Sequence, residues 1–368
     1  MRICFVSYDF PEYCIRHVNE LTEAGEVLLL LPEKITTDYV PLLNPRVRFE
    51  PFYKPRLRQP ASQVRTALGV VRAIQRFRPD VVHFQNGHMY FNLAMPLLSR
   101  FPLVITIHDP RQHLGDSESG HTPQWIMDFG FRRADHVIVH GRSLIETVVN
   151  ELGFARSDVH LIPLVALGEP GDRPELIADD DRTILFFGRI WEYKGLEFLI
   201  RAEPQVTSEF PDVTFVIAGR GEDLQRYRRL MTHPERFEVN EGWITDQDRA
   251  TLFSRASAVV LPYVEATQSA VVPIAYAHAK PVVATRVGGL PDMVEHGVTG
   301  LLVEPRDVDG LADAIKQLLR DRDARIRMGQ AGKEKLVREC SPAVVARQTL
   351  AVYQAAIASR SGPRRRME

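Results

Sequence analysis

The sequence predicts an α/β protein built from two doubly wound, Rossmann-like domains that face each other across a cleft. Short apolar runs alternate with amphipathic stretches along the chain, which is typical of parallel sheets covered by helices on both faces. The alternation is interrupted once, at residues 167–182, and then restarts. A chain of 368 residues with 45% hydrophobic side chains is long enough for about two domains.

The expected strands are short apolar runs bounded by polar or turn residues. In the first half of the chain they cover residues 3–7, 27–31, 81–84, 103–107, 137–139 and 159–162, and in the second half residues 183–187, 213–218, 258–261, 281–284 and 300–303. Amphipathic segments at residues 17–24, 63–77 and 143–152 are expected to be helices. Because parallel strands end at one edge of a sheet, ligands are expected at that edge.

The stretch at residues 167–182 is polar, contains proline and glycine, and is the expected linker. We therefore expect an N-terminal domain at residues 1–168 and a C-terminal domain at residues 169–341, with the ligand site between them. The amphipathic segment at residues 342–360 is expected to cross back to the N-terminal domain. Residues 361–368 are expected to form a disordered tail.

Composition excludes several classes of function. The formal net charge of −1 gives no global attraction to nucleic acid, and the three cysteines form no C-x-x-C pair of a zinc site or disulfide framework. No charged leader with an apolar signal region begins the chain, and no apolar run approaches the ~20 residues needed to cross a bilayer. A cytoplasmic protein is expected.

One local cluster of charge stands out, at residues 46–78. It contains nine basic residues and a single acid, Glu50. A solvated helix and loop face explains the cluster about as well as contact with an acidic acceptor or with the anionic inner face of a membrane does. Nucleic acid is the least favoured partner, because no recognition helix, zinc pattern or interleaved aromatic residues accompany the charge.

The segment TILFFGRIWEYKGL at residues 183–196 suits a diphosphate. A buried strand leads into Gly188, and Arg189 and Lys194 follow at the start of a helix. Glycine lets the backbone approach a phosphate closely, and two fixed cations neutralise the charge that grows on a departing nucleotide. No metal or other cofactor is then required. An ordinary surface arginine and lysine remain the alternative.

Two further segments indicate a nucleotide. The G-x-G of Gly219 and Gly221 follows a strand but lacks the third glycine of a dinucleotide fingerprint, which disfavours a dehydrogenase. Ile244 lies in an expected loop, at residues 242–244, where backbone groups can contact the edge of a base.

A single carboxylate, Glu265, follows the strand at residues 258–261. The short run that begins the next apolar helix includes Gln268, Ser269 and Ala270. There, backbone N–H groups can bind phosphate while the acid contacts sugar hydroxyls.

The chain resembles family 4 of the retaining glycosyltransferases, which have the two-domain GT-B architecture. The similar motifs are PDVVHF at residues 79–84, TIHD at 106–109, ADHVIV at 134–139, GRIWEYKG at 188–195, and KPVVATRVGGLPDMVEHGVTGLLVEP at 280–305. The resemblance implies that Arg189 and Lys194 bind the donor diphosphate. It also implies that His108 lies near the donor sugar, that the N-terminal domain at residues 1–168 holds the acceptor, and that the C-terminal domain at residues 169–341 holds the donor.

The resemblance fails at two points. In the family's E-x(7)-E motif Glu265 takes the first position, but Pro273 stands at the second, where the family commonly binds the donor ribose. Aligning backward from residues 280–281 places Ala266 and Ile274 at the two positions instead. The first loop, at residues 7–21, also lacks the paired glycines that often approach donor phosphate.

The function that these residues predict is transfer of a hexose, with retention, from a nucleotide diphosphate sugar to a hydroxyl of a glycan, glycolipid or natural-product acceptor, with UDP favoured over GDP. Domain closure is expected to exclude water, and the departing phosphate to take the acceptor proton. Two alternatives stay open. A sugar-nucleotide epimerase would need no acceptor, and a catalytically inactive binding protein would bind the donor without transfer.

Overall fold

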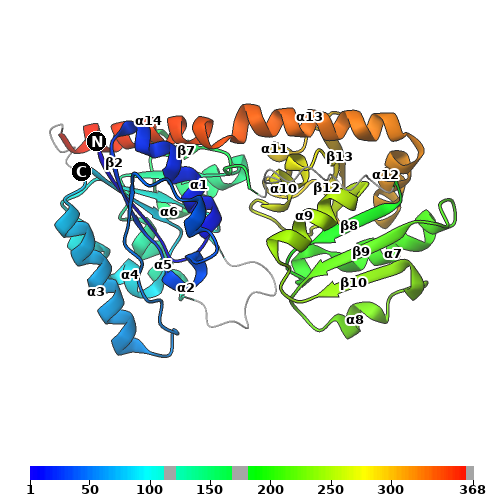
Figure 1. Cartoon of the computed structure of the whole chain (residues 1–368), viewed down its shortest axis with the longest axis horizontal. Coiled ribbons are helices and arrows are strands. Elements are labelled where there is room, and N and C mark those ends of the chain that lie inside the picture. The colour runs from blue at the N-terminus through cyan, green and yellow to red at the C-terminus, as the bar shows by residue number, and fades with distance from the viewer. Residues whose placement is uncertain (112–121, 168–180, 362–368) are drawn as a thin grey trace. The chain divides into compact units, whose positions relative to one another are not determined.

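The computed structural model describes residues 1–111, 122–167 and 181–361, which divide into two compact units. The first unit contains residues 1–111, 122–165 and 341–361, and the second contains residues 166–167 and 181–340. Each unit has its own parallel sheet (Figure 1). Each also has its own hydrophobic core. The expected tail from residue 362 and most of the expected linker lie outside the described residues.

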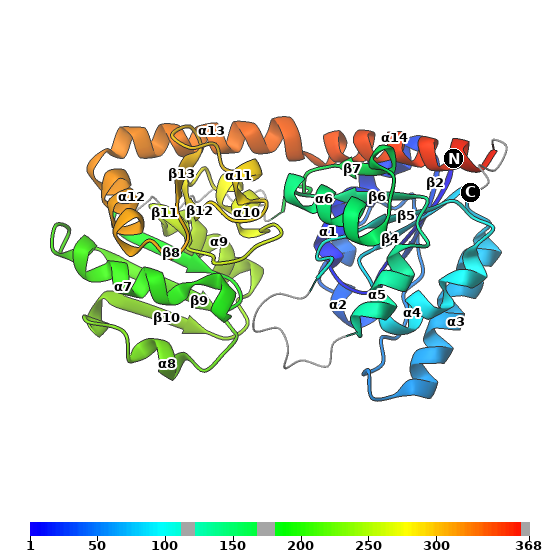
Figure 2. The ribbon, with the colours of Figure 1, turned by 180° about the vertical axis from the view of Figure 1, so that it is seen from behind.

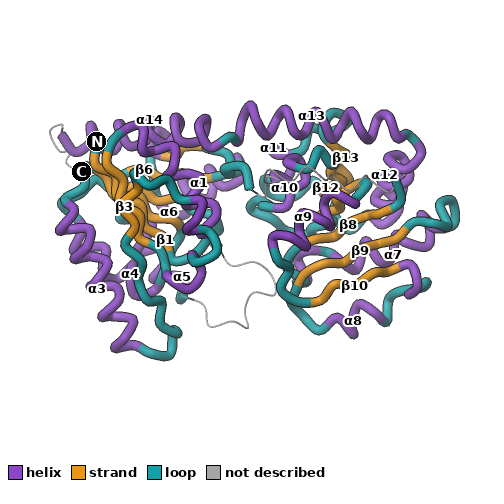
Figure 3. The backbone as a smooth tube through the Cα atoms, in the orientation of Figure 1, coloured by secondary structure: helices purple, strands orange, loops and turns teal. Residues whose placement is uncertain are grey.

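Within the described residues, the sheet of the first unit has seven parallel strands in the order β3-β2-β1-β4-β5-β6-β7. Figure 3 draws the strands in orange and the helices in purple. The strands are β1 (Arg2–Ser7), β2 (Glu26–Leu30), β3 (Val47–Phe49), β4 (Val81–Gln85), β5 (Leu103–Thr106), β6 (His136–Val139) and β7 (Val159–Leu161). The helices are α1 (Pro11–Leu21), α2 (Glu33–Thr36), α3 (Pro60–Phe77), α4 (Met89–Ala94), α5 (Gln124–Phe131), α6 (Arg142–Leu152) and α14 (Pro342–Ser361).

The second unit repeats this plan with six parallel strands in the order β10-β9-β8-β11-β12-β13, counted over the part of the chain that the structure describes. Its strands are β8 (Thr183–Phe187), β9 (Thr214–Gly219), β10 (Phe237–Glu241), β11 (Ala258–Leu261), β12 (Val282–Thr285) and β13 (Gly300–Val303). Its helices are α7 (Leu196–Thr207), α8 (Leu224–Arg228), α9 (Asp246–Arg255), α10 (Val271–Ala277), α11 (Leu290–Met293), α12 (Val308–Arg320) and α13 (Arg322–Cys340).

The predicted fold of two parallel, doubly wound sheets is confirmed. All eleven expected strands overlap observed ones. The sequence prediction missed β3 and β10, and each of these is the outermost strand on one side of its sheet. Both consist mostly of partly exposed residues, including charged ones, so neither has the apolar run that marks a buried strand.

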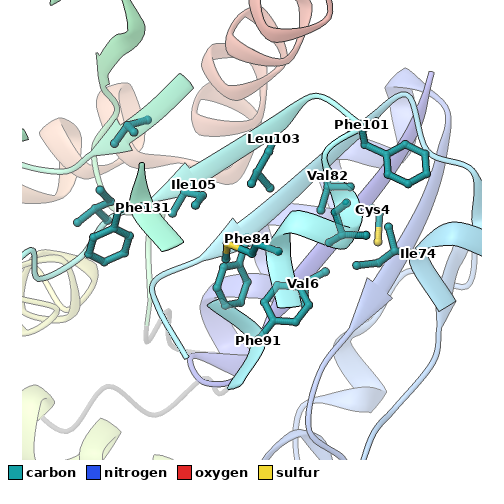
Figure 4. Packing of buried hydrophobic residues seen from close by; sticks show 14 of the residues in the cluster. Cys4, Val6, Ile74, Val82, Phe84, Phe91, Phe101, Leu103, Ile105 and Phe131 are labelled. Carbon is teal, nitrogen blue, oxygen red and sulfur yellow. The ribbon is translucent and has the colours of Figure 1, made fainter. Parts of the chain in front are cut away.

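The core of the first unit follows from the alternation of side chains along its strands. One face of the sheet carries Cys4, Val6, Val82, Phe84, Leu103 and Ile105, all less than 5% exposed (Figure 4). These residues pack in one cluster with Ile74 of α3, Phe91 of α4 and Phe131 of α5. Full burial of a side chain of this size contributes about 1.5–3 kcal/mol.

The opposite face of the first sheet is covered by α1 and α14 (Figure 2). Two hydrogen bonds join α14 to its neighbours: His17 Nε2 of α1 lies 3.0 Å from Thr349 Oγ1, and His83 Nδ1 of β4 lies 2.6 Å from the hydroxyl of Tyr353. The last helix of the chain is therefore an integral layer of the unit that the first residues begin.

The first unit has several buried histidines. Burial lowers the pKa of His17, His88 and His108 to about 3 and that of His140 to about 4, and it lowers the pKa of His83 well below its ordinary value. Neighbouring imidazoles lower several of these values further. The folded unit therefore holds neutral imidazoles where the unfolded chain would hold cations below pH 6.5.

The stability of the first unit should fall steeply as the pH drops from about 6.5 to 4.5. In that interval the histidines bind protons in the unfolded state but not in the folded state. Each buried histidine therefore lowers the free energy of unfolding by about 1.4 kcal/mol per pH unit. Denaturant unfolding followed across this interval measures the slope. His17→Gln should reduce the slope by about one proton, and the native chain and the variant should have the same slope at pH 8. A pH-independent free energy of unfolding would contradict the neutral core.

Candidate active site

The carboxyl ends of the second sheet carry loops that touch through their backbones. The loop after β8 begins at Gly188, and the last residue of β9 is Gly219. The N–H of Ile190 donates to the carbonyl of Arg220 at 2.9 Å, and Ile190 forms a parallel bridge with Gly221. The two loops therefore continue side by side beyond the sheet.

This contact explains the G-x-G pattern. A Cβ atom on Gly219 would lie 1.8 Å from the carbonyl oxygen of Gly188, and the φ of 147° at Gly219 is one that other residues rarely adopt. The glycines predicted to bind nucleotide thus have a packing role at the edge of the sheet. Contact of Gly188, Gly219 or Gly221 with a ligand stays a prediction.

Arg189 and Lys194 lie beside the same pair of buried aromatic rings. Lys194 Nζ is 3.7 Å from the ring centroid of Tyr263 and 4.9 Å from that of Tyr193, and the guanidinium of Arg189 is 5.9 Å from the Tyr193 ring. Arg189 is exposed and Lys194 is half-buried. The turn that carries Lys194 ends at Gly195, whose φ of 64° suits glycine. Two cationic side chains therefore lie next to a pair of buried tyrosine rings.

The hydroxyl of Tyr263 stays protonated. Burial raises the pKa of this group to about 12, although the hydrogen bond from Ser269 and the charge of Arg189 act in the opposite direction. Tyr263 and Tyr193 were not singled out in the sequence analysis. A signal for them exists, because each is an aromatic residue in the loop that follows a buried strand.

The polar run before α10 is already partly engaged. Ser269 Oγ lies 3.3 Å from the hydroxyl of Tyr263 and accepts the N–H of Val271, the first residue of α10, at 3.2 Å. Gln268 is half-buried, and Ala270, directly before the helix, is exposed. A phosphate contact at Ser269 would therefore use the backbone rather than the hydroxyl.

Glu265 lies half-buried in the same loop, and its N–H donates to the carbonyl of Tyr193 at 3.4 Å. Pro273 is the third residue of α10, where a proline is tolerated because its missing N–H has no partner within the helix. Ala266 and Ile274 are buried and apolar. In both alignments of the two-glutamate motif, an apolar residue therefore occupies the position of the second carboxylate.

The loop after β10 presents a flat surface. Trp243 is 75% exposed, and the guanidinium of Arg220 lies 5.1 Å above its ring. Ile244 is half-buried next to it. The sequence analysis placed the tryptophan only in a loop and did not single out the arginine, since no local pattern joins the ends of β9 and β10.

His108 lies in the first unit, two residues after β5. It is 3% exposed, and its Nε2 is 2.9 Å from Oε1 of Gln85. The ring of Phe10 lies 4.6 Å away and that of His140 lies 4.9 Å away. Burial and the nearby imidazole lower the pKa of His108 to about 3, while Asp109 raises it. The side chain can therefore donate or accept hydrogen bonds, but it is not a cationic acid near neutral pH.

The first loop uses a non-glycine residue at its sharpest point. Phe10 has a φ of 59° and directly precedes α1. The left-handed conformation that a glycine would adopt easily is thus held by a phenylalanine whose ring lies against His108. In this loop, which lacks the family's paired glycines, Phe10 therefore contacts His108, a predicted site residue.

The predicted residues form two groups, one in each unit. His108 belongs to the first unit, and all the others lie at the carboxyl edge of the second sheet. In the described residues, no group of three or more His, Cys, Asp or Glu side chains could hold a metal ion. None of the helices in the described ranges has both the length and the apolar character that crossing a membrane requires.

Two protein families match the chain. Residues 12–164 match the family described as Glycosyltransferase Family 4, and residues 181–321 match the one described as Glycosyl transferases group 1. An uncharacterized glycosyltransferase of Methanocaldococcus jannaschii is 32% identical over 319 residues, which cover 81% of this chain and 80% of that protein. The glycogen synthase of Mycobacterium tuberculosis is 29% identical over 310 residues, or 79% and 72% of the two chains.

Solved structures share the fold. The Anabaena protein HepE in complex with UDP-glucose has a TM-score of 0.74 and 18% identity, covering 96% of this chain and all of that one. Sucrose-phosphate synthase from Thermosynechococcus elongatus has a TM-score of 0.72 and 20% identity, covering 98% of this chain and all of that one. These structures have the GT-B architecture, which the two sheets described above reproduce.

Gly219→Ala should destabilise the second unit by roughly 2 kcal/mol or more, because the methyl group meets a backbone carbonyl that cannot move aside. Gly69→Ala is the matched control. Nothing lies within 4 Å of a Cβ at that position on α3, so this change should be neutral or stabilise by up to about 1 kcal/mol. Chemical denaturation of both variants measures the difference. Equal stability of the two variants would disprove the tight loop contact.

Proposed function

The chain belongs to the group 1, family 4 glycosyltransferases, and from that premise we propose that it moves a hexose, with retention, from UDP-sugar to a hydroxyl acceptor. One observation carries the proposal. Arg189 and Lys194 stand over the buried Tyr193 and Tyr263 rings at the carboxyl edge of the second sheet. This is the edge at which parallel α/β sheets bind nucleotides.

The two cations match the charge of a diphosphate. As the bond between the sugar C1 and the phosphate oxygen breaks, its electron pair moves to the phosphate, and negative charge grows there. Cations that are already held beside the two tyrosine rings can stabilise that charge without rearrangement. Backbone N–H groups at residues 268–270 supplement them in the proposal. Under it, no metal ion is required for the leaving group.

Retention follows if the acceptor attacks from the face that the phosphate leaves. The acceptor oxygen forms the new bond to C1, and its proton passes to the departing phosphate oxygen, so no strong protein base is required. In this scheme Glu265 and His108 orient sugar hydroxyls rather than attack C1. The neutral state of His108 suits that role, since a neutral imidazole can accept a hydrogen bond from a hydroxyl.

Similar proteins support UDP as the nucleotide. HepE was solved with UDP and with UDP-glucose. The exposed ring of Trp243 beside Ile244 offers a planar surface at the edge where the base is proposed to lie. Because apolar residues fill both alternatives for the second glutamate, the ribose hydroxyls need another partner. The acceptor proposed is a glycan, a lipid-linked sugar or a small natural product.

Arg189→Ala and Lys194→Ala should each lower kcat with UDP-sugar by about 100-fold or more, because each removes a charge from the leaving group. Arg201→Ala is the control, since this exposed arginine on α7 pairs only with Glu197 in the contacts described. Donors are first selected by thermal shift with UDP- and GDP-sugars. Near-normal rates in both variants would remove the phosphate assignment.

The anomeric configuration of the product, followed by proton NMR, tests retention. Inversion would disprove the proposed mechanism while leaving the transferase assignment intact. Donor incubated without acceptor separates the alternatives. Interconversion of two UDP-sugars would establish an epimerase, and binding without transfer or hydrolysis to any acceptor would establish an inactive binding protein.

We also propose that an anionic membrane surface contacts the basic segment at residues 46–78. Four of its nine basic residues are in ion pairs, at Arg46, Arg48, Lys54 and Arg76. Five have no ion pair among the described residues, namely Arg56, Arg58, Arg65, Arg72 and Arg78. The loop before α3 also exposes Tyr53 by 66% and Leu57 by 39%, and α3 exposes Val64 by 47%.

The loop and the helix form one surface. Thr66 Oγ1 donates to the carbonyl of Tyr53 at 3.0 Å, and Gln63 Nε2 donates to that of Pro55 at 2.8 Å. Arginines beside exposed apolar side chains suit the interface of an anionic bilayer. A lipid-linked acceptor would then be presented at the surface of this unit.

The double variant Arg58→Ala/Arg65→Ala should bind vesicles of 30% phosphatidylglycerol more weakly, by about 1 kcal/mol per arginine. Co-sedimentation at low and high salt measures the affinity, which should fall as salt rises. Arg228→Ala/Arg229→Ala, at exposed positions of the second unit, should leave it unchanged. Equal binding of the native chain to purely zwitterionic vesicles would contradict the proposal.

A further inference from the structure

Four polar side chains share the buried face of the first sheet beneath α14. His83 and Gln85 alternate along β4, and Thr106 ends β5 two residues before His108. The two strands pair so that Gln85 lies opposite Thr106. Because side chains alternate with a period of two, all four point to the same face. Each is less than 4% exposed, so their mutual hydrogen bonds decide their proton positions.

The orientation of the Gln85 amide determines which atoms donate and which accept in this group. Gln85 Nε2 donates to Thr106 Oγ1 at 3.3 Å and lies 3.2 Å from His83 Nε2. Thr106 Oγ1 is 2.8 Å from the same nitrogen. An amide N–H that faces an imidazole nitrogen at this distance requires that nitrogen to be the acceptor. His83 therefore carries its proton on Nδ1 and donates it to the hydroxyl of Tyr353, 2.6 Å away.

The other end of the amide faces His108. With Nε2 of Gln85 turned toward His83, its Oε1 is the atom 2.9 Å from His108 Nε2. An amide oxygen only accepts, so His108 Nε2 must donate. Since His108 is neutral, it has a single ring proton, and that proton is then on Nε2. Gln85 also forms a side-chain hydrogen bond with the hydroxyl of Tyr13 on α1.

We propose that Gln85 is a positioning residue that holds His108 in the Nε2–H tautomer, so that Nδ1 of His108 is the nitrogen that accepts a hydrogen bond from the donor sugar. The same amide orientation sets the tautomer of His83, which then donates from Nδ1 to the hydroxyl of Tyr353 on α14. The chain of contacts thus links the last helix of the protein to the tautomer of a residue near its reaction centre. The part that concerns the sugar rests on the proposed function, whereas the tautomer itself does not.

The opposite arrangement has a clear signature. If the amide of Gln85 were turned over, its NH₂ would face His108, and the proton of His108 would move to Nδ1. His83 would then donate from Nε2 and accept from Tyr353. The two arrangements therefore predict opposite tautomers at both histidines.

Two-bond ¹H–¹⁵N correlation spectra of the full chain, labelled with ¹⁵N-histidine, distinguish the tautomers directly. His108→Asn and His83→Asn identify the signals. We expect an Nε2–H pattern for His108 and an Nδ1–H pattern for His83. An Nδ1–H pattern for His108 would overturn the inference, and it would do so whether or not the protein transfers sugar.

Variants at Gln85 test the kinetic consequence. Gln85→Leu removes the acceptor, so His108 should populate both tautomers and kcat should fall by roughly 10-fold or more with little change in KM for the nucleotide sugar. Gln85→Glu keeps an acceptor oxygen and should restore the Nε2–H pattern and part of kcat. Gln317→Leu, an exposed change on α12, is the control and should alter neither readout.

The spectroscopic and kinetic results separate two failures. If His108 populates both tautomers in Gln85→Leu but kcat does not fall, Gln85 sets the tautomer of His108. In that case the tautomer does not affect catalysis, and the proposed link to catalysis is disproved. An unchanged tautomer in that variant would disprove the positioning role itself. Should Gln85→Leu fail to fold, the spectrum of the native chain and that of Gln85→Glu still decide the tautomer.

Discussion

The second unit depends on one steric constraint, which is that the loops leaving β8 and β9 touch through bare backbone. The backbone of Gly219 packs against the carbonyl group of Gly188, and Ile190 and Gly221 then form a parallel bridge. Main-chain hydrogen bonds then fix where the loop after β8 runs, and with it the turn that carries Lys194. The two cations of the candidate site therefore owe their places to main-chain contacts, which are stiffer than side-chain packing.

The sequence predicts the apolar strands well, whether they lie inside the sheet, as β8 and β11 do, or at its edge, as β13 does. Strands β8, β11 and β13 have the predicted bounds, since each is apolar along its length and ends at polar or turn residues. The outer strands β3 and β10 include charged residues on a partly exposed surface, so composition alone does not separate them from loops. Helix α1 begins at Pro11, six residues before the predicted start, because Tyr13, Cys14 and Ile15 are buried without a clear polar face.

The candidate site was predictable where one segment holds all its parts. A single motif contains Arg189 and Lys194, so their proximity followed from the sequence. The two tyrosine rings next to them could not be predicted in this way. Tyr193 and Tyr263 come from loops about 70 residues apart, which only the fold brings together. The pairing of Arg220 with Trp243 was missed for the same reason. Local patterns reveal charges more readily than the surfaces on which those charges rest.

Buried polar groups explain why the first unit needs the end of the chain. His17 and His83 are almost wholly enclosed, and a buried polar atom left without a hydrogen bond costs about 1–3 kcal/mol. Their partners Thr349 and Tyr353 are on α14, which follows the entire second unit in the sequence. Residues 1–165 alone would leave this face of the sheet open and would leave His17 Nε2 and His83 Nδ1 without these partners. Helix α14 therefore supplies hydrogen-bond partners that the first 165 residues do not provide at these positions, and through His83 it contacts the polar group that includes Gln85 and His108.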